Sequence, residues 1–129
     1  MQNILKTIPA LAGAVVYFSQ KNQPARCDAK DSSRFEIGVT LNPMFEKRYR
    51  FGEDAYVAKE RFICVTDGVG GWQRKLVDPG LFTKEFVQHM SKLYDNKQYS
   101  SLKELLDNAS KLTKARGSST CVMAELTDN

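Results

Sequence analysis

The sequence lacks the marks of several common classes of protein. Its 129 residues hold 19 lysines and arginines against 15 acidic residues, and these charges are scattered without a basic stripe. Nucleic-acid binding is therefore not expected. The composition, 42% hydrophobic and 26% charged, is ordinary for a globular domain, and the length predicts one such domain.

Cysteines are few and form no CxxC pair, which argues against a disulfide scaffold or a zinc knuckle. The three are Cys27, Cys64 and Cys121. The last two lie inside apolar runs, where a free cysteine acts as a small hydrophobic residue. Reduced cysteines indicate an intracellular compartment.

Acidic residues are absent before Asp28, while Lys6, Lys21 and Arg26 precede it. The apolar stretch at residues 8–18 is too short to span a bilayer as a helix, which takes about 20 residues. A basic start, a short apolar run and no acids suit a targeting segment. Secretion and mitochondrial import both fit; the reduced cysteines favour mitochondria, although transit peptides are usually richer in arginine.

We expect residues 1–30 to be retained as an anchor or docking segment that contacts protein or a membrane. The alternative is an ordinary first helix of the domain, broken near Pro9 and Gly13.

Alternating apolar positions predict strands at residues 35–41 and 118–126, and a hairpin of residues 55–58 and 61–66 that turns at Lys59-Glu60. Residues 42–52 are predicted to be a loop. Three glycines at positions 68, 70 and 71 predict a sharp turn with positive φ.

Two helices are predicted between the hairpin and the last strand. Asp78 and Pro79 suit the N-cap and first position of the first helix. Ser101 and Glu104 form a capping box for the second helix, with Gly117 as its C-cap. The predicted buried faces are Phe82, Phe86, Met90 and Leu93 on the first helix, and Leu102, Leu105, Leu106, Ala109 and Leu112 on the second.

This order of elements predicts an α/β layering of antiparallel strands with two packed helices. His89 lies off the apolar stripe and has no second candidate ligand near it in sequence, so a surface position is expected rather than a metal site.

Three blocks carry the chemistry: residues 52–56 (GEDAY), residues 65–72 (VTDGVGGW) and residues 117–121 (GSSTC). In this order and spacing they resemble the PPM (type-2C) metal-dependent Ser/Thr protein phosphatases. The similarity is greatest to a largely mitochondrial branch with Asp-Gly-Val-Gly-Gly-Trp, which Val77-Asp78-Pro79 also fits. Residues 31–129 then form the N-terminal half of such a domain, a partial sandwich.

The resemblance implies a metal site at Asp67, Gly68, Glu53 and Asp54. In the family the matching aspartate bridges two Mg²⁺ or Mn²⁺ ions, and the residue matching Gly68 contributes its carbonyl. The acidic pair holds metal-bound waters, and a bridging water attacks phosphorus. Without the resemblance, Asp67 and Gly68 would be a plain strand-ending turn, and the acidic pair an exposed one.

The departures from the family bear on activity. A full domain is roughly twice this long, and its later Asp-Gly and Asp-Asn blocks, which supply further metal carboxylates, do not occur here; Asp128-Asn129 echoes the last one in the wrong place. Family members outside this branch place a phosphate-binding arginine a few residues before the acidic pair. Arg48 and Arg50 are near, but neither has the usual spacing, and the phosphate-binding residues are left unassigned. No catalytic residue is assigned with certainty.

The favoured hypothesis is a non-catalytic structural subunit, a pseudoenzyme held by protein partners in a larger assembly at the mitochondrial inner membrane. It would hold Mg²⁺ or Mn²⁺ only if the missing half were supplied. The alternative is a fragment of an active Mg²⁺- or Mn²⁺-dependent Ser/Thr phosphatase. An unrelated small α/β domain is the third.

Overall fold

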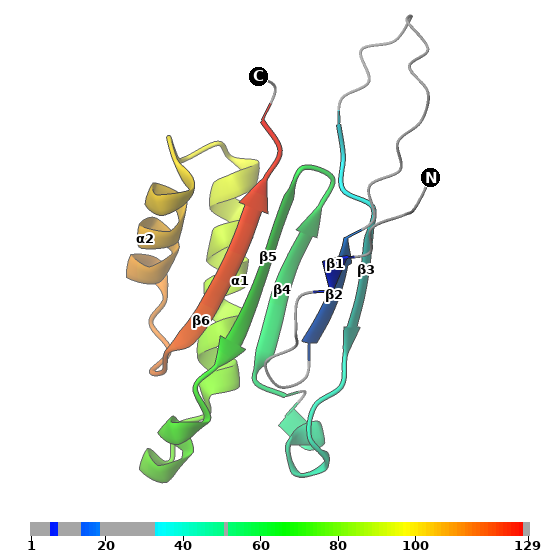
Figure 1. The fold of residues 1–129 in the computed structure, drawn as a ribbon. Helices are drawn as coiled ribbons and strands as arrows, with labels where there is room; N and C mark the ends of the chain where they lie inside the picture. Colours follow the sequence, from blue (N-terminus) through cyan, green and yellow to red (C-terminus); the bar gives the residue numbers. More distant parts are fainter. Residues whose placement is uncertain (1–5, 8–13, 19–32, 51, 128–129) are drawn as a thin grey trace, which may run out of the picture.

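The computed structural model describes residues 6–7, 14–18, 33–50 and 52–127. These residues form two sheets, two α-helices and two short 3-10 helices (Figure 1). In chain order the elements are β1 (Lys6–Thr7), β2 (Ala14–Phe18), β3 (Ile37–Leu41), η1 (Phe45–Arg50), β4 (Asp54–Lys59), β5 (Phe62–Gly68), η2 (Gly70–Lys75), α1 (Pro79–Asp95), α2 (Leu102–Leu112) and β6 (Ser119–Glu125).

The central sheet has the order β4-β5-β6, and both of its ladders are antiparallel. Its first two strands form the predicted hairpin. Lys59 pairs with Phe62, so the turn is Glu60-Arg61, one residue later than predicted. The last strand, β6, confirms the strand predicted at residues 118–126 and pairs along the whole of β5.

Helices α1 and α2 cover one face of the central sheet (Figure 1). On that face the side chains of Ala55, Val57, Phe62 and Cys64 are buried against α1. The predicted stripe of α1 is confirmed as core: Phe86, Met90 and Leu93 are buried and Phe82 packs against them. Burial of such side chains contributes roughly 1.5–3 kcal/mol each.

The start of α1 follows the prediction closely. The Asp78 carboxylate accepts a hydrogen bond from the Gly80 backbone N–H at 2.9 Å, and Pro79 holds the first helical position. The absence of a side chain at Gly80 allows close packing, because a Cβ there would lie 2.6 Å from the Gly52 carbonyl oxygen. The helix thus begins in contact with the first of the three sequence blocks.

One of the two hydrogen bonds predicted for the capping box of α2 is present, and the other has a different donor. The Ser101 hydroxyl accepts from the Glu104 N–H at 3.2 Å, but the Glu104 carboxylate accepts from the Ser100 N–H rather than from that of Ser101. Leu105 and Ala109 are fully buried, as predicted. Leu112 is 45% exposed, so its predicted burial is wrong: the helix ends at this residue, past the edge of the core.

Three predictions about turns need correction. The predicted loop at residues 42–52 contains η1. Gly68, Gly70 and Gly71 have no positive φ, because Gly68 still belongs to β5 and the other two begin η2. Gly117 does not cap α2, whose C-cap is Thr113; a Cβ at Gly117 would instead lie 2.6 Å from Cβ of Phe82.

The second sheet has the order β1-β2-β3 and is antiparallel. The helix considered for the N-terminal segment is therefore wrong at residues 6–7 and 14–18, which are strands whose backbone groups pair with a neighbouring strand. The rest of residues 1–30, Pro9 and Gly13 included, lies outside the described residues. Within the described part of the chain, no helix combines the length and the hydropathy needed to cross a membrane.

Candidate metal centre

Backbone hydrogen bonds bring the three sequence blocks together at one end of the central sheet. The Gly68 N–H donates to the Glu53 carbonyl at 3.2 Å, which joins the first two blocks. The Val69 N–H and the Trp72 indole N–H donate to the carbonyl and hydroxyl of Ser118, at 2.9 and 2.8 Å, and join the second block to the third. Motifs that are far apart in sequence thus form one structural unit.

Asp54 and Asp67 lie directly opposite each other in the β4–β5 ladder, and Thr120 of β6 continues the row. Side chains alternate between the two faces of a strand. Ala55 and Thr66, the next residues inward, are buried on the helix side, so the two aspartates lie on the opposite face. The sheet register therefore places two carboxylates together, away from the helices.

The pKa of Asp54 reflects the proximity of Asp67. Burial and the neighbouring charge of Asp67 raise the pKa of Asp54 from 3.8 to about 6, with a smaller opposing effect from Lys47. Two carboxylates at such a distance hold a proton or a cation more readily than either alone.

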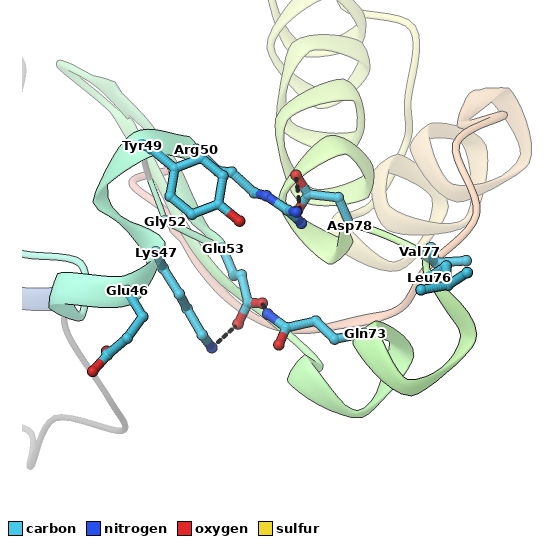
Figure 2. Close-up of a pocket in the computed structure, with 10 residues that line it drawn as sticks. All are labelled: Glu46, Lys47, Tyr49, Arg50, Gly52, Glu53, Gln73, Leu76, Val77 and Asp78. Carbon is cyan, nitrogen blue, oxygen red and sulfur yellow. Dashed lines mark hydrogen bonds and ion pairs between the residues drawn. The ribbon is translucent and has the colours of Figure 1, made fainter.

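Glu53 precedes β4 and lines the same cavity as the two aspartates, but its carboxylate binds other side chains. Its carboxylate accepts hydrogen bonds from the Lys47 ammonium and the Gln73 amide, each at 2.5 Å (Figure 2). Its carbonyl oxygen accepts from the Thr83 hydroxyl at 2.7 Å. Glu53 thus ties η1, η2 and α1 together at the end of the sheet.

Among the three glycines of the second block, Gly68 is the one at which an added Cβ would clash with its neighbours. A Cβ there would lie 2.9 Å from the Glu53 carbonyl oxygen and 3.2 Å from Cβ of Pro79. The glycine therefore permits close approach of three elements rather than an unusual backbone angle.

Two cavities flank the ion pair between Lys47 and Glu53. One, of about 380 Å³, is also lined by Asp54 and Asp67. The other, of about 490 Å³, lies between η1 and η2 on the far side of Glu53 (Figure 2). In this second cavity Arg50 lies 3.8 Å from Asp78.

Comparison with known proteins explains this arrangement. No family model matches the chain. Two proteins of Arabidopsis thaliana do. Probable protein phosphatase 2C 80 is 36% identical over 115 residues, which cover 85% of this chain and 28% of that protein. Probable protein phosphatase 2C 26 is 37% identical over 94 residues, which cover 70% of this chain and 32% of that protein. The Drosophila virilis protein phosphatase PTC7 homolog fig is 32% identical over 79 residues, which cover 56% of this chain and 25% of that protein.

A solved structure extends the likeness to the fold. The X-ray structure of the photosystem II phosphatase PBCP matches with a TM-score of 0.67 and 33% identity, over 71% of this chain and 38% of that one. The chain is homologous to the type-2C (PPM) protein phosphatases. The predicted class, antiparallel strands layered with helices, is thereby confirmed. The chain spans about a third of the length of these phosphatases.

The type-2C likeness permits a test of whether the described residues fit a divalent cation. Asp54 and Asp67 do, since they are hard oxygen donors held opposite each other beside a cavity. Glu53 does not join them, since its carboxylate binds Lys47 and Gln73 instead. Over the described ranges, no three carboxylate, imidazole or thiol side chains gather closely enough to hold a metal. Asp54 and Asp67 therefore supply only part of the oxygen shell that a divalent cation needs.

The structure also places residues that sequence patterns did not single out. Lys47 and Gln73 hold Glu53. Nothing in their local sequence indicated these partners. Arg48 lines the same cavity as Asp54 and Asp67, and its Nε donates to the Pro43 carbonyl at 3.5 Å. Arg50 lines the other cavity and faces Asp78.

Proposed function

We propose that this chain supplies part of the metal-binding centre of a Mg²⁺- or Mn²⁺-dependent protein phosphatase that acts on phosphoserine and phosphothreonine. The observation that carries the proposal is the pairing of Asp54 with Asp67 on the helix-free face. Carboxylates placed opposite each other cost stability unless a proton or a cation lies between them. Their retention in a chain homologous to type-2C phosphatases favours a metal-binding role over a structural one.

Asp54 and Asp67 would hold the cation, with Gly68 leaving room for the backbone to approach. A divalent ion bound there would supply electrostatic stabilisation of the charge that develops on a transferred phosphoryl group. Lys47 contributes the nearest positive charge on the protein side and lowers the pKa of Asp54. Glu53 positions this lysine and η2 rather than the ion.

The test measures Mn²⁺ binding to the purified 129-residue chain by electron paramagnetic resonance of free Mn²⁺. We expect weak but measurable binding at neutral pH, and at least about a tenfold loss of affinity, or 1.4 kcal/mol, in Asp67→Asn and Asp54→Asn. Asp107→Asn is the matched control, since Asp107 is an exposed carboxylate on α2 paired with Lys103. Equal binding by all four proteins would overturn the proposal.

Catalysis calls for more than this chain provides, because the chain spans only about a third of its type-2C relatives. We expect the purified chain to hydrolyse a phosphothreonine peptide at a rate close to background. A longer natural product that contains this sequence is expected to hydrolyse it in Mn²⁺, and its Asp67→Asn variant is not. Loss of activity without loss of fold, judged by circular dichroism, would assign the aspartate to the reaction.

The second candidate is the non-catalytic structural subunit favoured by the sequence alone. One observation supports it: the helix-free face carries a row of Tyr56, Val65 and Val122, and Val122 is 69% exposed. An apolar row of this kind suits contact with further protein. The composition of residues 1–30 supports a mitochondrial location at the inner membrane, with that segment as the membrane or protein contact.

A native gel and an intact mass separate the two candidates. A chain near 14.6 kDa that migrates within a large complex would establish a structural subunit. A much heavier chain that runs alone and binds Mn²⁺ would establish the phosphatase. Mitochondrial import of a fluorescent fusion that needs residues 1–30 tests the location separately.

A further inference from the structure

Two cysteines lie in contact on neighbouring strands of the central sheet. The Sγ atoms of Cys64 in β5 and Cys121 in β6 are 3.5 Å apart, and both are free thiols. In the ladder, Cys64 is opposite Met123, and Cys121 is opposite Thr66. The two cysteines are therefore diagonal neighbours on the helix-covered face, although 57 residues separate them in sequence.

The two thiols differ in the properties that decide which one reacts. Cys64 is 1% exposed, at the centre of the core, whereas Cys121 is only partly buried on the edge strand. Their contact raises the pKa of the Cys64 thiol and lowers that of Cys121. A partly exposed thiol with a lowered pKa, beside a second thiol in reach, is the arrangement found in oxidant-sensitive cysteine pairs.

We propose that Cys64 and Cys121 form a peroxide-oxidisable dithiol, in which Cys121 reacts first and Cys64 closes a reversible disulfide between β5 and β6. The inference is independent of the phosphatase role proposed above.

The chemistry balances with hydrogen peroxide as the oxidant. The Cys121 thiolate sulfur attacks one peroxide oxygen, the O–O bond breaks, and the departing hydroxide takes up a proton to leave as water. The Cys64 sulfur then attacks the sulfenic sulfur of Cys121; the S–S bond forms, the S–O bond breaks, and a second water leaves with the Cys64 proton. Two electrons pass from the sulfurs to the peroxide.

The disulfide would form with a modest movement of two strands. The sulfur atoms must approach from 3.5 Å to roughly 2.05 Å. Diagonal neighbours in a sheet are farther apart than direct partners, so the bond would be easily reduced again. It would join β5, which carries Asp67, to the edge strand β6.

The experiment uses the 129-residue chain with Cys27→Ser, which leaves the two thiols of interest. The reduced protein is treated with one equivalent of hydrogen peroxide under native conditions. It is then denatured, so that a buried free thiol also reacts, alkylated with N-ethylmaleimide and weighed intact. We expect the loss of two hydrogen atoms, no alkylation at either cysteine, a cross-linked Cys64–Cys121 peptide and full reversal by dithiothreitol. With Cys64→Ala, dimedone is expected to label Cys121.

The matched control moves one thiol to the other face of the same strand, in Cys27→Ser/Thr120→Cys/Cys121→Ser. Its thiols lie on opposite sides of the sheet and should both be alkylated. Two alkylated thiols in the Cys27→Ser protein, or oxidation of Cys121 to sulfinic acid with Cys64 still free, would overturn the proposal. The Cys27→Ser result decides the question even if Cys64→Ala fails to fold.

Discussion

Asp54 and Asp67 are register partners in the β4–β5 ladder, and both lie on the face of the central sheet that the helices leave open. Burial, and then the charge of Asp67, raise the pKa of Asp54 to about 6. Ionisation of Asp54 at neutral pH therefore costs free energy in the folded protein. The predictions on pH, on Lys47 and on Gly68 test the structure around it.

The first prediction concerns the dependence of stability on pH. Because the folded-state pKa of Asp54 lies above its ordinary value of 3.8, its contribution to stability is complete below about pH 3.8 and is lost as the pH rises through about 6. Asp54→Asn removes this loss. After allowance for solvent screening we expect a gain of about 1 kcal/mol at pH 7.5.

Urea unfolding of the wild type and Asp54→Asn at pH 7.5 and 5 checks this prediction. The advantage of the variant should shrink at pH 5. Asp107→Asn, at an exposed carboxylate, should show no such pH-dependent gain. A constant difference between wild type and Asp54→Asn at both pH values would contradict the prediction.

The second prediction concerns the ion pair of Lys47 with Glu53. Lys47→Met leaves Glu53, a buried carboxylate, with only the Gln73 amide as a side-chain partner. We expect a loss of about 1–3 kcal/mol in the free energy of unfolding.

Lys103→Met on α2 is the control for that variant. Lys103 has an ion pair of the same 2.5 Å length, but its side chain is 82% exposed against 28% for Lys47. Its loss is expected to leave the free energy of unfolding close to that of the wild type. Chemical unfolding measures both; equal effects would show that burial of Glu53 does not matter.

The third prediction concerns the space at Gly68. Gly68→Ala forces a Cβ to within 2.9 Å of the Glu53 carbonyl oxygen, so β4, β5 or α1 must shift. We expect a loss of about 1–3 kcal/mol from overpacking. Gly71→Ala is the comparison, because the nearest atom to its Cβ lies 4.0 Å away, and thermal unfolding should leave it close to the wild type.

The fourth prediction concerns the link between the second and third blocks. Trp72→Phe removes the indole N–H that donates to the Ser118 hydroxyl at 2.8 Å, and Ser118→Ala removes the acceptor. Each is expected to cost about 1 kcal/mol. A double-mutant cycle should show that the two losses are not additive; additive losses would mean that the bond contributes nothing to stability.

Much of the local structure was determined by the sequence itself. Asp78 and Pro79 begin α1 as predicted, because an N-cap needs only a side-chain acceptor next to the first free N–H groups. The stripe of Phe86, Met90 and Leu93 sets the buried face of the helix by its spacing alone. Resemblance on three short blocks was enough to identify the type-2C homology that the comparisons establish.

The site was decided by tertiary structure. The sequence offered Glu53 and Asp54 as a pair, but the Glu53 carboxylate binds Lys47 and Gln73, and the ladder places Asp54 opposite Asp67. The contact of Cys64 with Cys121, and the place of Gly117 against Phe82, likewise depend on which strands and helices pack together. Sheet register is set by contacts between residues far apart in the chain, so no local pattern contains it.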